Sequence, residues 1–179
     1  EYMMGFGKTI EVTISDGTVT VRDYGRGVPL GKVVDVSSKM NTGAKYDSKA
    51  FKKSVGLNGV GIKAVNALSS YFLITSCRDG ECKRVEYNKA VIIDESDIQP
   101  TQEANGTKVV FVPDNTIFKD YQYKDEFVET LLKNYVFLNS GLTILYNGKR
   151  YHSRNGLVDL LNENMTTEPL YPIIHLKGE

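Results

Sequence analysis

The stretch SVGLNGVG, residues 54–61, runs directly into IKAVNAL, residues 62–68. Glycine lets the backbone take positive φ and approach a ligand closely. The second stretch has the spacing of an amphipathic helix. A helix that begins there directs its free N–H groups and the positive end of its dipole back at the glycines. Together the two stretches predict an anion site, most often one for phosphate, around which the rest of the domain is organised.

The composition is that of an ordinary globular domain. The chain has 179 residues, enough for one domain with a sizeable core. Lys and Arg number 22 and Asp and Glu number 22, so the charge balance gives no sign that this segment itself binds nucleic acid. With two histidines and two cysteines, a zinc site is not expected. No window approaches 18 apolar residues, so we expect no membrane contact and a cytoplasmic location.

Cys77 and Cys82 flank the turn signal Asp79–Gly80. A disulfide across a hairpin is one interpretation of this spacing. Reduced thiols are favoured, because no other feature of the chain indicates secretion.

Alternating apolar residues and turn dipeptides predict a series of hairpins. The expected strands and helices suggest an α+β fold, a two-layer sandwich with a mostly antiparallel mixed sheet and helices on one face. Residues 41–58 are polar and without periodicity, which is typical of a functional or mobile loop. The expected strands are 8–14, 19–23, 71–77, 81–87, 90–93, 108–112, 142–145 and 149–152, and the expected helices are 30–40, 59–68, 123–138 and 155–164.

Two of these helices carry a recognisable apolar face. In 123–138 the i, i+4 steps Phe127, Leu131 and Tyr135 mark an amphipathic helix. In 155–164 we expect the leucines at positions 157, 160 and 161 to point inward.

The glycine stretch has three competing interpretations. A P-loop requires a Lys and a hydroxyl residue directly after its last glycine, and the chain has Ile62–Lys63–Ala64 there. The dinucleotide fingerprint G-x-G-x-x-A fits residues 59–64, and Asp79 lies 20 residues after Gly59. That motif follows a buried parallel strand, whereas the preceding residues 49–54 are charged and loop-like.

The third interpretation is a site made of two separate boxes. One is DYGRGVP, residues 23–29, at the end of a strand, and the other is GLNGVG, residues 56–61, before a helix. A third piece is Gly106–Thr107, ahead of another strand. A carboxylate at a strand end between glycines can bind a flat, amine-bearing base, while the second box supplies N–H groups for phosphates. Each box alone is explained equally well by a tight turn.

On these motifs the chain resembles the ATPase domain of the B subunit of bacterial type II topoisomerases, of the GHKL or Bergerat-fold family shared with Hsp90 chaperones, histidine kinases and MutL proteins. The resemblance runs over essentially the whole chain. The short loops and the sequence VGLN at residues 55–58 are more similar to topoisomerase IV than to gyrase. The stretches that carry it are VRDYGRGVP (21–29), NTGAKYD (41–47) and GLNGVG (56–61), supported by GTKVVF (106–111) and FLNSG (137–141).

The resemblance implies an adenine site on the first box. Asp23 should accept the adenine amino group, and Thr107 and Gly27 should assist through an ordered water. Arg26 should lie over the adenine face, and Pro29 should wall the opposite edge.

The resemblance also implies a phosphate site and a lid. Lys45 would be a lid cation near the terminal phosphate, or else an ordinary solvated lysine. Arg78 would pair with Glu1 behind Arg26, or else be an ordinary surface charge. The residues expected to wrap the phosphates with their N–H groups are Gly56, Leu57, Asn58, Gly59, Val60 and Gly61.

Parts of the family's machinery are not expected in this sequence. Residues 1–7 read like the last turn of a helix, and the family's catalytic glutamate and Mg²⁺-binding asparagine would precede residue 1. Its γ-phosphate lysine would follow the last residue. We therefore expect no catalytic and no metal-binding residue here, poor ATP affinity and no turnover by this stretch alone. The expected division is an ATP-binding domain, 1–153, and a connection to a transducer domain, 154–179.

For the parent protein the resemblance implies an ATP-hydrolysing DNA topoisomerase that uses ATP and Mg²⁺. Its B subunits would dimerise on binding ATP, work with the A subunit, and contact DNA through other domains. The alternatives that remain are the B subunit of gyrase, a non-catalytic nucleotide-binding or interaction module, and a histidine-kinase-type domain.

Overall fold

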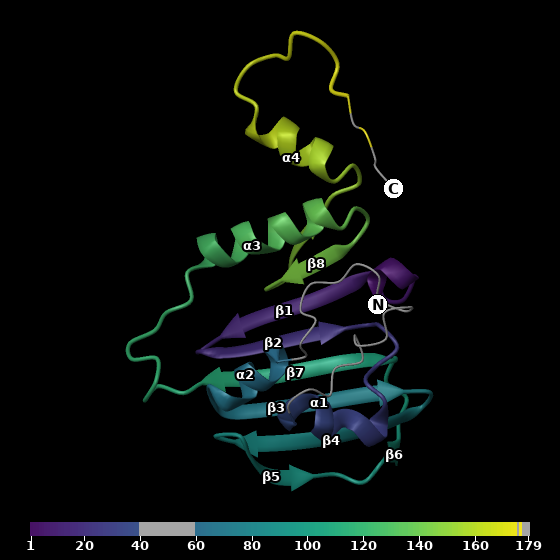
Figure 1. Cartoon of the computed structure of the whole chain (residues 1–179), viewed down its shortest axis with the longest axis vertical. Helices are drawn as coiled ribbons and strands as arrows, with labels where there is room; N and C mark the ends of the chain where they lie inside the picture. Colours follow the sequence, from purple (N-terminus) through teal and green to yellow (C-terminus); the bar gives the residue numbers. More distant parts are fainter. Residues whose placement is uncertain (40–59, 175, 177–179) are drawn as a thin grey trace.

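The computed structural model describes residues 1–39, 60–174 and 176. They form one mixed sheet with helices packed on one of its faces (Figure 1). The strands are β1 (Thr9–Ser15), β2 (Thr18–Asp23), β3 (Ser69–Arg78), β4 (Glu81–Asn88), β5 (Val91–Glu95), β6 (Gln99–Pro100), β7 (Gly106–Pro113), β8 (Thr143–Tyr146) and β9 (Lys149–His152). The helices are the 3-10 turns η1 (Tyr2–Met4) and η2 (Leu30–Lys32), and α1 (Val33–Ser38), α2 (Gly61–Ala67), α3 (Asp125–Leu138) and α4 (Leu157–Asn164).

The sheet runs in the order β5-β4-β3-β7-β2-β1-β8-β9, with β6 paired to β4. Only the pair β1–β8 is parallel among the described strands. The order interleaves distant parts of the sequence: β7 lies between β3 and β2, and β8 joins the sheet beside β1 (Figure 1). The predicted α+β fold with a mostly antiparallel sheet is confirmed.

Two-residue turns with left-handed backbone close the predicted hairpins. Asp16–Gly17, Asp79–Gly80 and Asn147–Gly148 all have positive φ at both positions, as the twist of a tight hairpin requires. A fourth turn of this kind joins β4 to β5 at Lys89–Ala90, with φ of 46° and 64°. Neither residue is a usual turn residue, so the sequence pattern did not indicate this turn.

Two apolar clusters lie between the sheet and its helices. One is formed by Leu132 and Val136 of α3 with Leu142, Ile144, Tyr146 and Tyr151. The other, here called the α1–α2 core, consists of Val33, Phe72, Ile74, Val85 and Tyr87, all 0% exposed. Burial of this much apolar side chain is the main favourable contribution to folding.

The face of α3 that packs on the sheet differs from the predicted one. Phe127, Leu131 and Tyr135 are more than half exposed, at 66%, 57% and 53%. The buried residues of the helix are Leu132, Val136 and Phe137. The helix carries two adjoining i, i+4 apolar stripes, one position apart, and periodicity alone does not say which of them faces the sheet.

The inward orientation expected for the leucines of α4 is wrong for Leu157 and Leu161, while Leu160 is half-buried. Leu157 is 50% exposed and Leu161 is 46% exposed. None of the described residues of α4 is buried, because the helix lies beyond the edge of the sheet instead of on its face (Figure 1).

The expectation that the two cysteines are reduced thiols is also wrong. Cys77 and Cys82 face each other across β3 and β4, with their Cα atoms 4.2 Å apart, and their sulfurs are bonded in a disulfide. Directly opposed residues of an antiparallel pair bring their Cβ atoms close together. The cellular compartment favours reduced thiols, but the register of β3 and β4 sets the two cysteines directly opposite each other.

None of the described helices is both long and apolar enough to cross a membrane.

A carboxylate joins α4 to the end of the sheet. Asp159 accepts hydrogen bonds from the hydroxyl of Ser153 at 2.7 Å and from the backbone N–H and side-chain amide of Asn155 at 3.0 and 2.9 Å. The Ser153 hydroxyl in turn accepts the N–H of Gly156 at 2.8 Å. Hydrogen bonds from Ser153, and next from Asn155, lower the pKa of Asp159 to about 2.

We predict that acid releases this joint. The pKa of Asp159 is lower in the folded protein than its ordinary value of 3.8. The carboxylate therefore stabilises the joint fully above about pH 4 and loses this effect as the pH falls toward 2. The backbone amide resonances of Asn155 and Gly156, followed by NMR against pH, should titrate near pH 2, and Asp159→Asn should abolish that titration. A midpoint near 3.8 would contradict the assignment.

Candidate functional site

The carboxylate of Asp23 sits at the end of β2, where three strands meet. Its Oδ1 accepts the N–H of Gly25 at 2.8 Å and the N–H of Thr107 at 3.3 Å. Its Oδ2 accepts no hydrogen bond from the described part of the chain. The side chain is half-buried. The backbone therefore holds one carboxylate oxygen in place and leaves the other able to accept an N–H from a ligand.

Two glycines let the backbone pass close to this carboxylate. Gly106 has φ +141°, and a Cβ there would overlap the carbonyl oxygen of Asp23. Gly27 has φ +77°, and a Cβ there would lie 2.5 Å from the carbonyl oxygen of Cys77. The hydroxyl of Ser76 also donates to the carbonyl oxygen of Val28 at 2.7 Å. These contacts hold the loop that follows Asp23 against β3 and β7, and only glycine allows them.

Arg26 is held by Glu1. Its Nε and Nη2 donate to the two carboxylate oxygens at 3.0 and 2.9 Å, and its backbone N–H donates at 3.1 Å. The guanidinium also lies 4.4 Å from the centre of the Phe6 ring. The side-chain hydrogen bond from Arg26 lowers the pKa of Glu1 to about 2. Both side chains are about 40% exposed, so the pair fixes geometry more than it adds stability.

Of the two expectations for Arg78, the pairing with Glu1 is wrong and the ordinary surface charge is correct. Arg78 contacts its neighbour Asp79, with 3.3 Å between Nε and Oδ2. The carboxylate of Glu1 already accepts hydrogen bonds from the guanidinium of Arg26 at both oxygens and from the backbone N–H of Arg26 at one of them.

The start of α2 supplies the described part of the predicted phosphate site. Val60 precedes the helix, is 40% exposed and accepts the N–H of Ala64 at 2.9 Å. Gly61 is the first helical residue and has open space around the position of a Cβ. The other residues predicted to contact phosphate, namely Lys45, Gly56, Leu57, Asn58 and Gly59, lie outside the described residues, as does the predicted lid.

A shared core connects the two halves of the candidate site. Val28, from the loop after Asp23, packs on the α1–α2 core, as do Ile62 and Val65 of α2. The structure thus brings Asp23, Gly27 and Thr107 together. It places the exposed Pro29 just before η2 and holds Arg26 on Glu1. Sequence reasoning missed Ser76, which could have been found only by pairing β3 with β7 in the register that sets Ser76 opposite Thr107.

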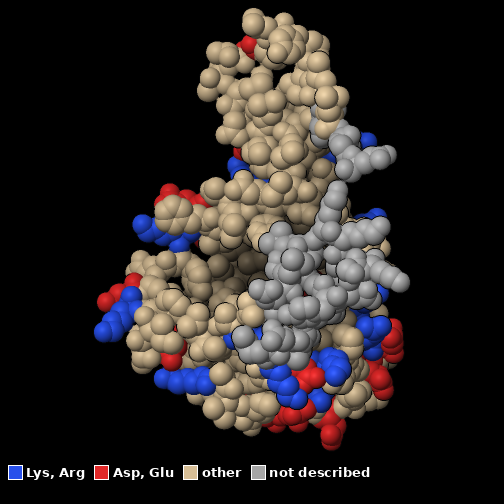
Figure 2. Space-filling view, viewed as in Figure 1, with Lys and Arg blue, Asp and Glu red and all other residues tan. Residues whose placement is uncertain are grey.

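A second hollow has a different character. It has a volume of about 320 Å³ and is lined mainly by apolar and aromatic side chains, among them Leu68, Phe111, Phe118, Tyr121 and Tyr123. It lies between α2 and the segment that leads to α3 (Figure 2). No Lys, Arg, Asp or Glu lines it, so it offers no positive charge to a phosphate.

Figure 2 shows charged side chains of both signs on this face of the molecule. In Figure 2, positive and negative side chains alternate along the lower edge, around α1, β4 and β5, while the face over α3 and α4 is mostly uncharged. Among the described residues, no group of three or more His, Cys, Asp or Glu side chains could hold a metal ion.

The comparisons with known proteins agree with this geometry. No protein-family model matches the chain. It is 43% identical over 180 residues to the B subunit of DNA topoisomerase 4 from Borreliella burgdorferi, covering 100% of this chain and 30% of that protein. It is 37% identical over 159 residues to the B subunit of DNA gyrase from Borrelia hermsii, covering 84% of this chain and 25% of that protein. The chain thus spans about a third or less of these relatives' length.

Among solved structures, the chain resembles the 43K ATPase domain of Thermus thermophilus gyrase B, crystallised with an aminocoumarin. The TM-score is 0.76 at 22% identity, and the match covers 96% of this chain and 48% of that one. The fold is therefore that of the GHKL, or Bergerat, ATPase domains. By sequence, the homologues of this chain are the B subunits of topoisomerase IV and DNA gyrase.

We predict that Gly106→Ala disrupts the site from within. The added Cβ overlaps the Asp23 carbonyl and the backbone is in a left-handed conformation, so the variant should be destabilised by more than about 2 kcal/mol. Urea unfolding measures the loss. Gly31→Ala is the matched control, since Gly31 has open space and no positive φ. Equal stability of the two variants would show that the strands are not packed this closely.

Proposed function

We propose that this chain is the ATP-binding domain of the B subunit of a bacterial type II DNA topoisomerase. The observation that carries the proposal is the half-occupied carboxylate of Asp23, whose Oδ2 is left to accept an N–H at a floor made by Gly27 and Gly106. An exocyclic amine on a flat ring, as in adenine, is the ligand group that such a site fits. The similarity to topoisomerase B subunits supports the same proposal.

In this proposal each half of the site has a separate task. Asp23 accepts the adenine amino group, and Thr107 and Gly27, which lie beside it, hold a water against the ring. Arg26, fixed by Glu1, lies over the adenine face, and Pro29 walls the opposite edge. The N–H groups of Val60 and Gly61 and of the preceding residues 56–59 bind the phosphates, with Lys45 as a cation near the last of them.

For the whole protein we propose ATP hydrolysis coupled to passage of one DNA duplex through another. Mg²⁺ would balance the phosphate charges, and its ligands would come from beyond the described residues. Closure of two B subunits on ATP, association with an A subunit and contact with DNA through other domains follow from the same proposal, as does a cytoplasmic location. We also propose 1–153 as the nucleotide-binding unit and 154–179 as the connection to the next domain.

The topoisomerase IV branch is favoured over the gyrase branch. The identity to the topoisomerase 4 relative is 43% over the whole chain, against 37% over 84% of it for the gyrase relative. The B subunit of gyrase is the second candidate, supported by the fold match. With its A subunit, the protein should decatenate linked DNA circles and should not introduce negative supercoils. Supercoiling would favour gyrase.

We predict that Asp23→Asn weakens binding of ATP at least about tenfold, because an amide cannot offer the same charged acceptor to the adenine amine. Calorimetry of the intact protein with the non-hydrolysable analogue AMPPNP measures this, and steady-state ATPase assays should show the same loss. Asp16→Asn, the same change at an exposed hairpin turn, is the control and should bind as the wild type does. Unchanged affinity in Asp23→Asn would rule out the assigned adenine site.

A further inference from the structure

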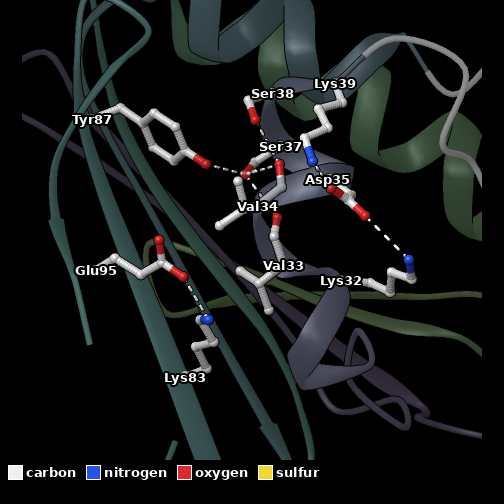
Figure 3. Close-up of polar contacts among 10 residues, drawn as sticks. All are labelled: Lys32, Val33, Val34, Asp35, Ser37, Ser38, Lys39, Lys83, Tyr87 and Glu95. Carbon is white, nitrogen blue, oxygen red and sulfur yellow. Dashed lines mark hydrogen bonds and ion pairs between the residues drawn. The ribbon is translucent and has the colours of Figure 1, made fainter. Parts of the chain in front are cut away.

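A chain of polar groups crosses the apolar α1–α2 core. The hydroxyls of Tyr87 on β4 and Ser37 on α1 lie 2.6 Å apart, and the side-chain amide of Asn66 on α2 donates to the carbonyl oxygen of Ser37 at 3.0 Å. Tyr87 and Ser37 are 0% exposed, and Asn66 is 1% exposed. Figure 3 shows the Tyr87 hydroxyl pointing at Ser37 on the buried side of α1. One strand and two helices are thus joined through groups that water does not reach.

The direction of these hydrogen bonds follows from the number of protons. The Ser37 hydroxyl has one proton, and it donates to the carbonyl oxygen of Val33 at 2.8 Å. The Tyr87 hydroxyl is therefore the donor to Ser37. Only one end of the Asn66 amide is hydrogen-bonded: its N–H donates to Ser37, while its Oδ1 is buried and has no hydrogen-bond partner among the described residues. A buried unsatisfied oxygen costs free energy, so stability alone does not account for an asparagine at this position.

Apolar residues of the same shape would fill this core. The Tyr87 ring packs edge-on against Phe72 with its centre 5.8 Å away, and phenylalanine would keep that contact. Removing a buried hydrogen-bonded network in favour of apolar groups is often neutral for stability. What the hydroxyl adds is direction, since a hydrogen bond fixes where the two partners lie and an apolar contact does not.

The elements that the network joins belong to the two halves of the candidate site. α1 follows the adenine box through η2, with Pro29 just before that turn. α2 begins at Gly61, directly after the glycine-rich stretch. Two other groups of polar contacts near α1 have different partners. Asp35 pairs with Lys32 and Lys39 at its own helix, and Lys83 pairs with Glu95 between β4 and β5 (Figure 3).

We propose that Tyr87, Ser37 and Asn66 are positioning residues for nucleotide binding: they set the start of α2 relative to the adenine half of the site without touching the ligand. This inference rests on the proposed function. Removing the network should therefore affect the two parts of the nucleotide differently. Loss of the network should impair recognition of the phosphates, which need both halves in register, and should spare recognition of the adenine ring, which needs the first half only.

The experiment compares two ligands on the intact protein, adenosine and ADP, by calorimetry. The test variants are Tyr87→Phe and Ser37→Ala. One matched control is Tyr146→Phe, which removes the hydroxyl that a buried tyrosine of the other core cluster donates to Asp125. The other is Ser38→Ala, which removes the neighbouring hydroxyl, whose hydrogen bond among the described residues is to Val34 of its own helix. Thermal unfolding reports the stability of all four.

We expect the affinity for ADP to fall about three- to tenfold in both test variants, because each variant loses the free energy of about one hydrogen bond. Adenosine affinity should stay within about twofold of the wild type, and both controls should keep the wild-type ratio. An unchanged ADP-to-adenosine ratio in the test variants, whether or not they melt earlier, would overturn the inference and leave the network merely structural. A wild-type protein that binds neither ligand would instead overturn the proposed function, and the inference with it.

Discussion

The structure depends on how closely two backbones approach at the end of β2. Asp23 and Gly106 meet with no room for a side chain between them, and Gly27 meets β3 at Cys77 in the same way. Because the strands touch here, the N–H of Thr107 reaches the Asp23 carboxylate. Glycine is the only residue that permits both contacts. The Asp23 carboxylate is therefore oriented by backbone N–H groups, and no other side chain is needed to hold it.

The same constraint brings together residues that are far apart in the sequence. Strand order places β7 beside both β2 and β3, so residues more than 80 positions apart share one carboxylate. The α1–α2 core then contacts both Val28, from the loop after Asp23, and Ile62, at the start of α2. The polar chain through Tyr87 adds direction to a core whose apolar contacts alone would allow the helices to shift.

Local signals predicted the parts of the fold that short segments determine. Asp–Gly and Asn–Gly dipeptides placed three hairpins, since those turns require left-handed residues. The two boxes placed Asp23 and the start of α2. Features that depend on tertiary packing were missed or wrong. The buried stripe of α3 depends on which neighbour it packs against, and the pairing of Glu1 with Arg26 and of Cys77 with Cys82 depends on loop position and strand register. Ser76 and Tyr87 gave no motif signal, because their partners lie on other elements.

Backbone amide NMR with AMPPNP can locate the adenine ring that we propose binds at Oδ2 of Asp23. The account predicts that the largest shifts on titration occur at the N–H groups of Gly25 and Thr107, which share the carboxylate, together with the first residues of α2. Shifts concentrated instead around Phe118 and Tyr121, at the apolar hollow, with Gly25 and Thr107 unmoved, would contradict it.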